Sequence, residues 1–148
     1  MTITTERVAA GPVTAMLPIP MQASPPPSPA ALSLLRQAEL GLYEAERTSD
    51  ACRRYVAAHL AALRAGASVL AVRAQPAGRA RSGRSVWQLL PSVAPELSEW
   101  AAFFAACSST RSMAEAGVSR AVTDRSADDL VRQAGHFLQV SRAVVCSR

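Results

Sequence analysis

The chain has 148 residues, of which 49% are hydrophobic, and its formal net charge is +5. This length predicts one domain with a sizeable core, and abundant alanine without strand-like runs favours an all-α fold. The three cysteines, Cys52, Cys107 and Cys146, lack the spacing of a disulfide framework or a zinc site. We therefore expect no metal, no cofactor and a cytoplasmic location.

The positive charge is concentrated in the middle of the chain. Residues 51–95 contain seven arginines and no acidic residue, whereas residues 1–50 carry net −2 and residues 96–148 carry net 0. Every basic residue is an arginine, which reflects either codon usage or phosphate binding, since a guanidinium group can hold a phosphate at two points. A concentrated arginine segment attracts polyanions, so RNA or a nucleotide is an expected partner.

Residues 1–28 are predicted to form a disordered Pro-rich tail, and residues 29–146 the folded domain. Seven prolines between Pro12 and Pro29 would break a helix there, which argues against a membrane span in this uncharged stretch. The run "PPPSP" suits a groove that binds polyproline, but a solvated tail is the simpler interpretation. We expect no membrane partner.

Four long helices and one short helix are predicted after the tail. The first covers residues 29–46 behind the capping Ser28, and the second covers residues 50–74. In the second helix, apolar residues recur at steps of four and three, the spacing of a buried bundle seam: Val56, Leu60, Leu63, Ala67 and Leu70. Gly66 in the same helix favours a close approach by a neighbouring helix.

The connection at residues 75–84 is predicted to be a loop from its Pro, Gly and Ser content. It carries Arg79, Arg81 and Arg84, and Arg73 comes just before it. Because guanidinium groups bind phosphate, these four arginines are the candidate nucleic-acid-binding residues. The alternative is a surface that only solubilises the protein.

The remaining helices follow this loop. Ser85 caps a short helix that stops near Pro91, a third long helix covers residues 95–116 and ends at Gly117, and the last covers residues 123–145. The aromatic residues of the third helix are interpreted as core, with a stacking platform for RNA bases as the alternative. Short connections favour an up-and-down four-helix bundle with one extra short helix.

Three stretches of the sequence, taken together, resemble a small actinobacterial branch of the HEPN superfamily. They are "RYVAAHLAALRAGASVLA", "SVWQLLPSVAPELSEWAAFFAA" and "VTDRSADDLVRQAGHFL", and the resemblance covers about residues 30–145. It implies a helical bundle that often forms a homodimer. It also implies a role in RNA biology, where some members are toxins or defence nucleases and some pair with a small nucleotidyltransferase.

The ribonuclease members of that superfamily carry an arginine, four to six residues and then a histidine. In their chemistry the pair positions the RNA phosphate and assists attack by the ribose 2′-hydroxyl, without a metal. Arg53 and Arg54 precede His59 with five and four residues between them. On a regular helix, however, the two arginines lie roughly 120° and 140° around the axis from His59. We therefore favour a histidine at the edge of the core over a catalytic one.

Arg132 and His136 form a second candidate pair in the last helix. They lie one turn apart and share a surface, but only three residues separate them, one fewer than the nuclease spacing requires. Asp128 and Asp129 next to them favour a solvated ladder of opposite charges as the simpler interpretation.

Three functions are compatible with the sequence. A noncatalytic HEPN-like module that binds RNA, a nucleotide or a partner is favoured, and it predicts salt-sensitive RNA binding. A metal-independent endoribonuclease of a toxin–antitoxin or defence system predicts cleavage of RNA in EDTA. A structural helical dimer that binds another protein predicts a large apolar patch on the bundle surface.

Overall fold

The computed structural model describes residues 27–73 and 83–147, and every element in these two ranges is helical, which confirms the all-α prediction. The predicted tail up to residue 26 and most of the predicted loop at 75–84 lie outside the described residues. The helices, in chain order, are α1 (Pro29–Glu46), α2 (Ala51–Arg73), α3 (Val86–Val93), α4 (Ser98–Ala106), α5 (Ser108–Glu115) and α6 (Asp124–Cys146), with short 3-10 turns at Pro95–Leu97 and Ser119–Ala121.

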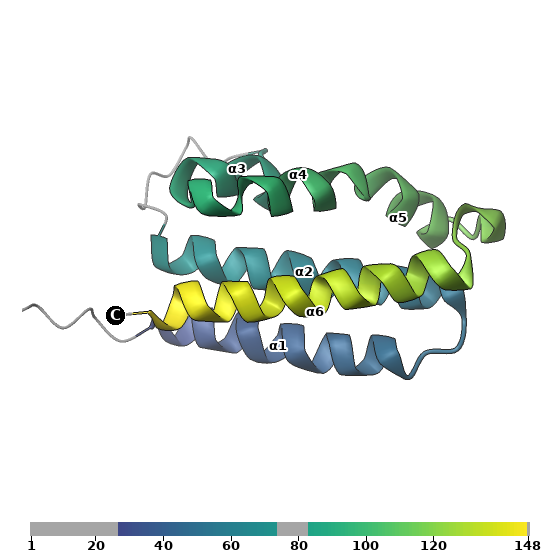
Figure 1. Cartoon of the computed structure of the whole chain (residues 1–148), viewed down its shortest axis with the longest axis horizontal. Helices are drawn as coiled ribbons and strands as arrows, with labels where there is room; N and C mark the ends of the chain where they lie inside the picture. The colour runs from purple at the N-terminus through teal and green to yellow at the C-terminus, as the bar shows by residue number, and fades with distance from the viewer. Residues whose placement is uncertain (1–26, 74–82, 148) are drawn as a thin grey trace, which may run out of the picture.

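The three longest helices, α1, α2 and α6, lie side by side, and α3, α4 and α5 form a further layer along α2 (Figure 1). The chain runs along α1, returns along α2, runs back through α4 and α5 and returns again along α6. α2 contacts α1, α6, α3 and α5. It is therefore the central helix, and most of the candidate site residues lie on it or at its two ends.

Three of the predicted helix starts are confirmed by their capping hydrogen bonds. The side chain of Ser28 accepts from the Ala31 N–H at 3.1 Å, and Pro29 follows in the first turn of α1. At the starts of α3 and α6, Ser85 and Thr123 each form a reciprocal capping box with the residue three positions later. These caps satisfy N–H groups that have no partner inside the helix.

Small residues build the buried side of α2. Ala58, Ala62 and Ala65 are fully buried, which lets neighbouring helices approach closely. The predicted buried seam is confirmed only in part, since Leu70 lies in the core and Val56 and Leu63 pack against it. Leu70 is buried, but Leu60 is 36% exposed and the other three are only half-buried: Val56, Leu63 and Ala67. α2 thus has apolar residues around most of its circumference, and the side that carries the alanines is the most deeply buried.

Gly66 allows the close approach that the sequence predicted. A Cβ at this position would lie 2.8 Å from Val86 Cγ1 and 3.4 Å from the Trp87 ring, so α3 packs directly on α2 here. The predicted end of the short helix near Pro91 is too early by two residues. α3 continues to Val93, because the Ala94 N–H donates to the Leu90 carbonyl at 2.8 Å and closes the last turn.

The third long helix is not continuous, which corrects the predicted bundle. Where one helix was expected over residues 95–116, the chain forms a 3-10 turn, then α4, then α5, with Cys107 between the last two. The Cys107 N–H is shared between the carbonyls of Phe103 and Phe104, at 3.2 and 3.1 Å. The Phe104 carbonyl also accepts from the His59 side chain, and a side chain that enters the hydrogen-bond ladder in this way bends a helix.

Candidate functional site

His59 lies in the core of the protein. It is 1% exposed, and its Nε2 is 2.9 Å from the carbonyl oxygen of Phe104. Because a carbonyl oxygen only accepts, Nε2 must carry the proton and donate it. The ring also meets Trp87 and Phe104 edge-on, at centroid distances of 5.9 and 6.1 Å. The side chain therefore joins α2 to α4 and does not face solvent.

The charge state of His59 follows from this burial. Desolvation lowers its pKa below the usual 6.5, because the charged imidazolium loses its hydration in the core. The hydrogen bond to the Phe104 carbonyl has the opposite effect and raises the pKa, but it is the smaller of the two effects. The other ring nitrogen, Nδ1, has no hydrogen-bond partner among the described residues. The ring is therefore neutral at pH 7, with its second nitrogen enclosed by the core.

Arg54 connects the α1–α2 turn to the start of α6. Its Nη1 donates to the carbonyls of Thr48 and Ser49 at 2.9 and 3.0 Å. Its Nη2 lies 3.0 Å from Asp124 Oδ1, and its Nε lies 3.0 Å from Asp128 Oδ1. The Arg54 side chain is 10% exposed, whereas both carboxylates are open to solvent. Its guanidinium is thus held in place by two terminal nitrogens that form hydrogen bonds and by an Nε that forms an ion pair with Asp128 without a hydrogen bond, and these contacts tie parts of the fold together.

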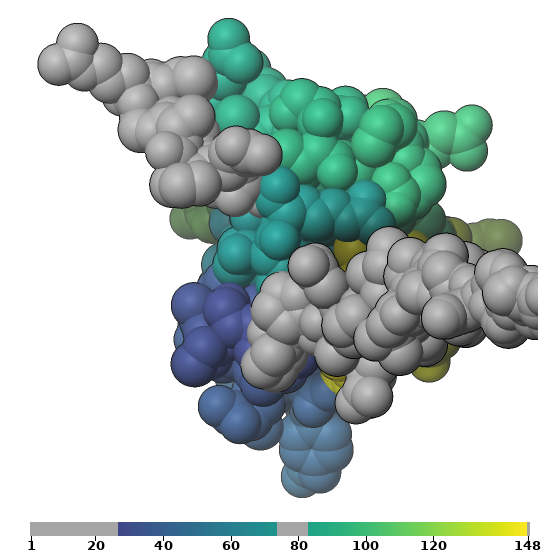
Figure 2. All heavy atoms as spheres, turned by 90° about the vertical axis from the view of Figure 1, so that its left-hand side faces the viewer, coloured from purple at the N-terminus to yellow at the C-terminus, as the bar shows by residue number. Residues whose placement is uncertain are grey.

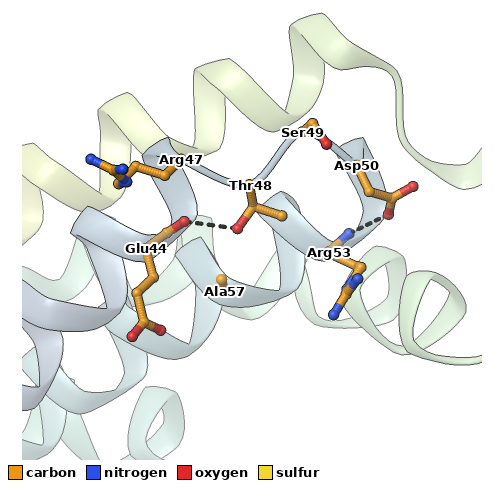
Figure 3. A pocket seen from close by; sticks show the side chains of 7 residues that line it. All are labelled: Glu44, Arg47, Thr48, Ser49, Asp50, Arg53 and Ala57. Carbon is orange, nitrogen blue, oxygen red and sulfur yellow. Dashed lines mark hydrogen bonds between the residues drawn. The ribbon is translucent and has the colours of Figure 1, made fainter.

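Arg53 is exposed and lines a surface pocket of about 450 Å³ between the end of α1 and the start of α2. Arg47 lies on the other side of this pocket, with Thr48 and Ala57 between the two arginines (Figure 3). Asp50 accepts from the Arg53 backbone N–H at 2.9 Å and caps α2. His59 does not line the pocket, so the structure brings neither Arg53 nor Arg54 together with it.

The second candidate pair, Arg132 and His136, is exposed on α6. Both terminal nitrogens of Arg132 donate to Asp129 Oδ1 at 3.0 Å, in the turn that precedes it. His136 lies in the turn that follows, so the guanidinium is directed away from it. The Asp129–Arg132 pair is the kind of contact that the charge-ladder interpretation predicts.

The candidate nucleic-acid-binding arginines lie at or beyond the C-terminal end of α2. Arg73 pairs with Glu96 at 2.7 Å. The Glu96 backbone N–H and the Arg73 guanidinium lower the pKa of the Glu96 carboxyl. Arg84 is exposed and makes no ion pair within the described part of the chain. Arg79 and Arg81 lie outside it, so their role stays a prediction.

Sequence reasoning missed the role of Arg54 and the pocket at the α1–α2 turn. The sequence feature that could have indicated the role of Arg54 is the four-residue spacing of Asp124 and Asp128, which places two carboxylates on one face of α6. The pocket had no such signal, since Arg47 and Arg53 line the same pocket only because the turn between α1 and α2 is short. In the two described ranges, no three His, Cys, Asp or Glu side chains gather as a metal ion would need.

Comparison with known proteins identifies a family. The sequence matches the family model described as SAV_6107-like HEPN over residues 45–142, which is more than half of the chain. The matched region begins at the end of α1 and includes most of α6. No curated protein and no solved structure matches the chain.

Proposed function

This chain belongs to the SAV_6107-like HEPN family, and on that basis we propose that it is a helical module that binds RNA without cleaving it. The observation that carries the proposal is the burial of His59, which is 1% exposed and donates to the Phe104 carbonyl. General acid–base catalysis needs a side chain within hydrogen-bond reach of the substrate. Since Arg54 is also occupied, by Asp124 and Asp128, the geometry favours binding over cleavage.

The binding half of the proposal rests on arginines that stay available. Within residues 51–95, Arg54 and Arg73 form ion pairs with carboxylates from later parts of the chain. Arg53, Arg64 and Arg84 have no ion pair in the described ranges. The positive excess of this segment is therefore reduced but remains substantial, and it supports contact with a polyanion.

We place the RNA contacts at Arg73, Arg79, Arg81 and Arg84. Figure 2 views the molecule from the end at which α2 finishes, where α2 lies between α1 and the layer that contains α3. The Arg73–Glu96 pair is partly exposed, and an exposed pair of this kind is weak enough for an RNA phosphate to replace the carboxylate. Arg84 comes directly before Ser85, the residue that caps α3, and its guanidinium forms no ion pair within the described residues.

The proposal is tested by the salt dependence of RNA binding. A labelled single-stranded RNA is titrated with the full chain over a series of NaCl concentrations, and the dissociation constant is measured by fluorescence anisotropy. Each lost phosphate contact lowers the slope of log K against log salt by about 0.7. Replacing Arg79, Arg81 and Arg84 with serine should therefore lower that slope by about 2.

A matched control removes three other arginines with the same change in net charge. Arg36, Arg120 and Arg125 are exposed and have no ion pair among the described residues. Their replacement with serine should leave the slope nearly unchanged. An equal loss in both triple variants would show that only net charge matters. No binding by the wild-type chain at low salt would refute the proposal.

A further inference from the structure

A groove of about 470 Å³ lies between α1 and α6, which run side by side (Figure 1). We call it the α1–α6 groove. Leu138, which is 7% exposed, and the half-buried Leu42 lie at the edge of the core and form its floor. Tyr43 from α1 and Gln139 from α6 are exposed and line its two sides. The groove thus offers an apolar floor between an aromatic ring and an amide.

Gly135 also lines the groove, and packing within the chain does not require a glycine there. A glycine inside a helix costs about 1 kcal/mol relative to alanine. A Cβ at Gly135 would lie 3.5 Å from Leu42 Cδ2, which is an ordinary contact that the fold would accept. Its backbone is ordinary helix within α6, so no positive φ calls for a glycine either. What the missing side chain provides is a deeper groove, open to a ligand.

The arginines around the groove are already engaged. Arg142 forms an ion pair with Glu39 across the two helices, so this pair carries no net charge. Arg47 Nη1 donates to the Tyr43 hydroxyl at 2.9 Å, and its guanidinium carbon lies 5.3 Å from the ring centroid. These contacts hold the ring in place while Tyr43 stays 56% exposed. Glu46, the remaining charged residue of the lining, is exposed to solvent, so an uncharged apolar ligand fits the floor and the ring best.

Proline-rich peptides are ligands of this kind. They dock on aromatic-lined grooves because the proline ring fixes an extended backbone before binding. This backbone forms no internal hydrogen bonds, so its carbonyls can accept from a side chain such as the Gln139 amide. The run "LPIP", residues 17–20, combines two prolines with two large apolar side chains, and residues 8–28 carry no charge. The chain therefore contains a suitable ligand in its own sequence.

The place of this run in the chain matches the place of the groove along α1. The described part of the chain begins at Pro27, and at about 1.5 Å per residue Leu42 lies about 20 Å along the axis from the start of α1. A proline-rich segment that folds back along α1 covers about 3.1 Å per residue, so it needs about six residues for this distance and about two for the reversal. Counting back from Pro27 then reaches Ile19. Leu32, which is 37% exposed and on the same face of α1 as Tyr43, lies on this path.

We propose that residues 17–20 dock in the α1–α6 groove of the same molecule, with Ile19 packed on Leu42 and Gly135. Because the segment is tethered to α1, its effective concentration at the groove is in the millimolar range, and a weak contact is enough to keep it bound. The inference does not depend on RNA binding, because none of the proposed RNA contacts lines the groove.

Disulfide trapping in the full chain tests where the segment lies. Pro20→Cys and Gln139→Cys are introduced together in a Cys146→Ser background, which removes the exposed native cysteine. In the control, Ala143→Cys replaces Gln139→Cys. Ala143 is also exposed on α6, does not line the groove and lies one turn closer to the end of α6 that is next to the start of α1 (Figure 1). An undocked segment reaches Ala143 at least as easily, whereas a docked one should be trapped about tenfold faster at position 139.

Substitutions in the segment test its apolar contacts without changing any described residue of the bundle. Leu17→Ser together with Ile19→Ser should slow trapping at position 139 to the rate of the control. Val8→Ser together with Val13→Ser, which removes two apolar residues elsewhere in the same tail, should leave the rate nearly unchanged.

Substitutions in α1 test the groove itself. Tyr43→Ser should slow trapping several-fold, whereas Leu40→Ser should not, because Leu40 is 64% exposed on α1 and does not line the groove. Circular dichroism checks that both variants are folded. Equal trapping rates at positions 139 and 143, or a rate that Leu17→Ser with Ile19→Ser leaves unchanged, overturn the proposal. A cross-linked product of twice the chain mass of 15.6 kDa also overturns it, because the segment then occupies the groove of another copy.

Discussion

Replacing His59 with alanine should destabilise the protein strongly, although the residue is polar. The ring is 1% exposed and packs between Trp87 and Phe104. Truncating a buried side chain of this size leaves a cavity and costs about 2–4 kcal/mol of unfolding free energy. Loss of the hydrogen bond to the Phe104 carbonyl adds about 1 kcal/mol. That carbonyl keeps a weaker donor in the Ser108 hydroxyl at 3.3 Å, so we expect a total of about 3–4 kcal/mol.

Urea unfolding followed by tryptophan fluorescence measures this loss. Trp87 lies against the His59 ring and Trp100 stacks on Phe104, so both tryptophans report on the same part of the core. His136→Ala is the control, because His136 is exposed on α6. Surface substitutions of this kind usually change stability by less than about 0.5 kcal/mol.

The outcome separates a structural from a catalytic histidine. A His59→Ala protein as stable as the His136→Ala protein would refute the reasoning, because it would mean that the ring does not hold α4 against α2. The refutation would be complete if the same substitution also abolished an activity on RNA.

Three further predictions concern pH, the α1–α2 turn and helix packing. Unfolded His59 gains a proton below pH 6.5 while the folded ring, with its lowered pKa, stays neutral, so stability should fall as pH drops below 6.5, and His59→Gln should flatten that profile. Arg54→Ala should cost about 2 kcal/mol in urea unfolding, because packing and hydrogen bonds are lost but the carboxylates it pairs with stay solvated. Gly66→Ala should lower the melting temperature, because its Cβ would lie 2.8 Å from Val86. Gly41→Ala should raise it, because there the Cβ makes ordinary contacts and helix propensity improves by about 1 kcal/mol.

Local signals explain what the sequence predicted correctly. Ser28, Ser85 and Thr123 mark helix starts because a cap needs only its own side chain and the next three residues. Gly117 marks the end of α5 for a similar reason, since its φ of +85° suits a residue without a Cβ. The regular rotation of a helix, about 100° per residue, is enough to place the two arginines before His59 on other faces than the histidine.

Contacts between distant segments explain what the sequence did not predict. The break between α4 and α5 depends on His59, 45 positions before the Phe104 carbonyl that it binds. The role of Arg54 depends on Asp124, 70 positions later. The choice of the buried side of α2 depends on how closely α1 and α6 approach, and the apolar periodicity of the helix fits either side. Each of these features exists only once the helices have packed.

The fate of bound RNA tests the central claim most directly. The wild-type chain is incubated in EDTA with end-labelled RNA, at a protein concentration that saturates binding, and the RNA is then resolved on a denaturing gel. With His59 buried and Arg54 held by Asp124 and Asp128, we predict that all of the bound RNA is recovered at full length. Cleavage products that the wild-type chain generates, and that disappear when His59 and His136 are both replaced with alanine, would contradict this account.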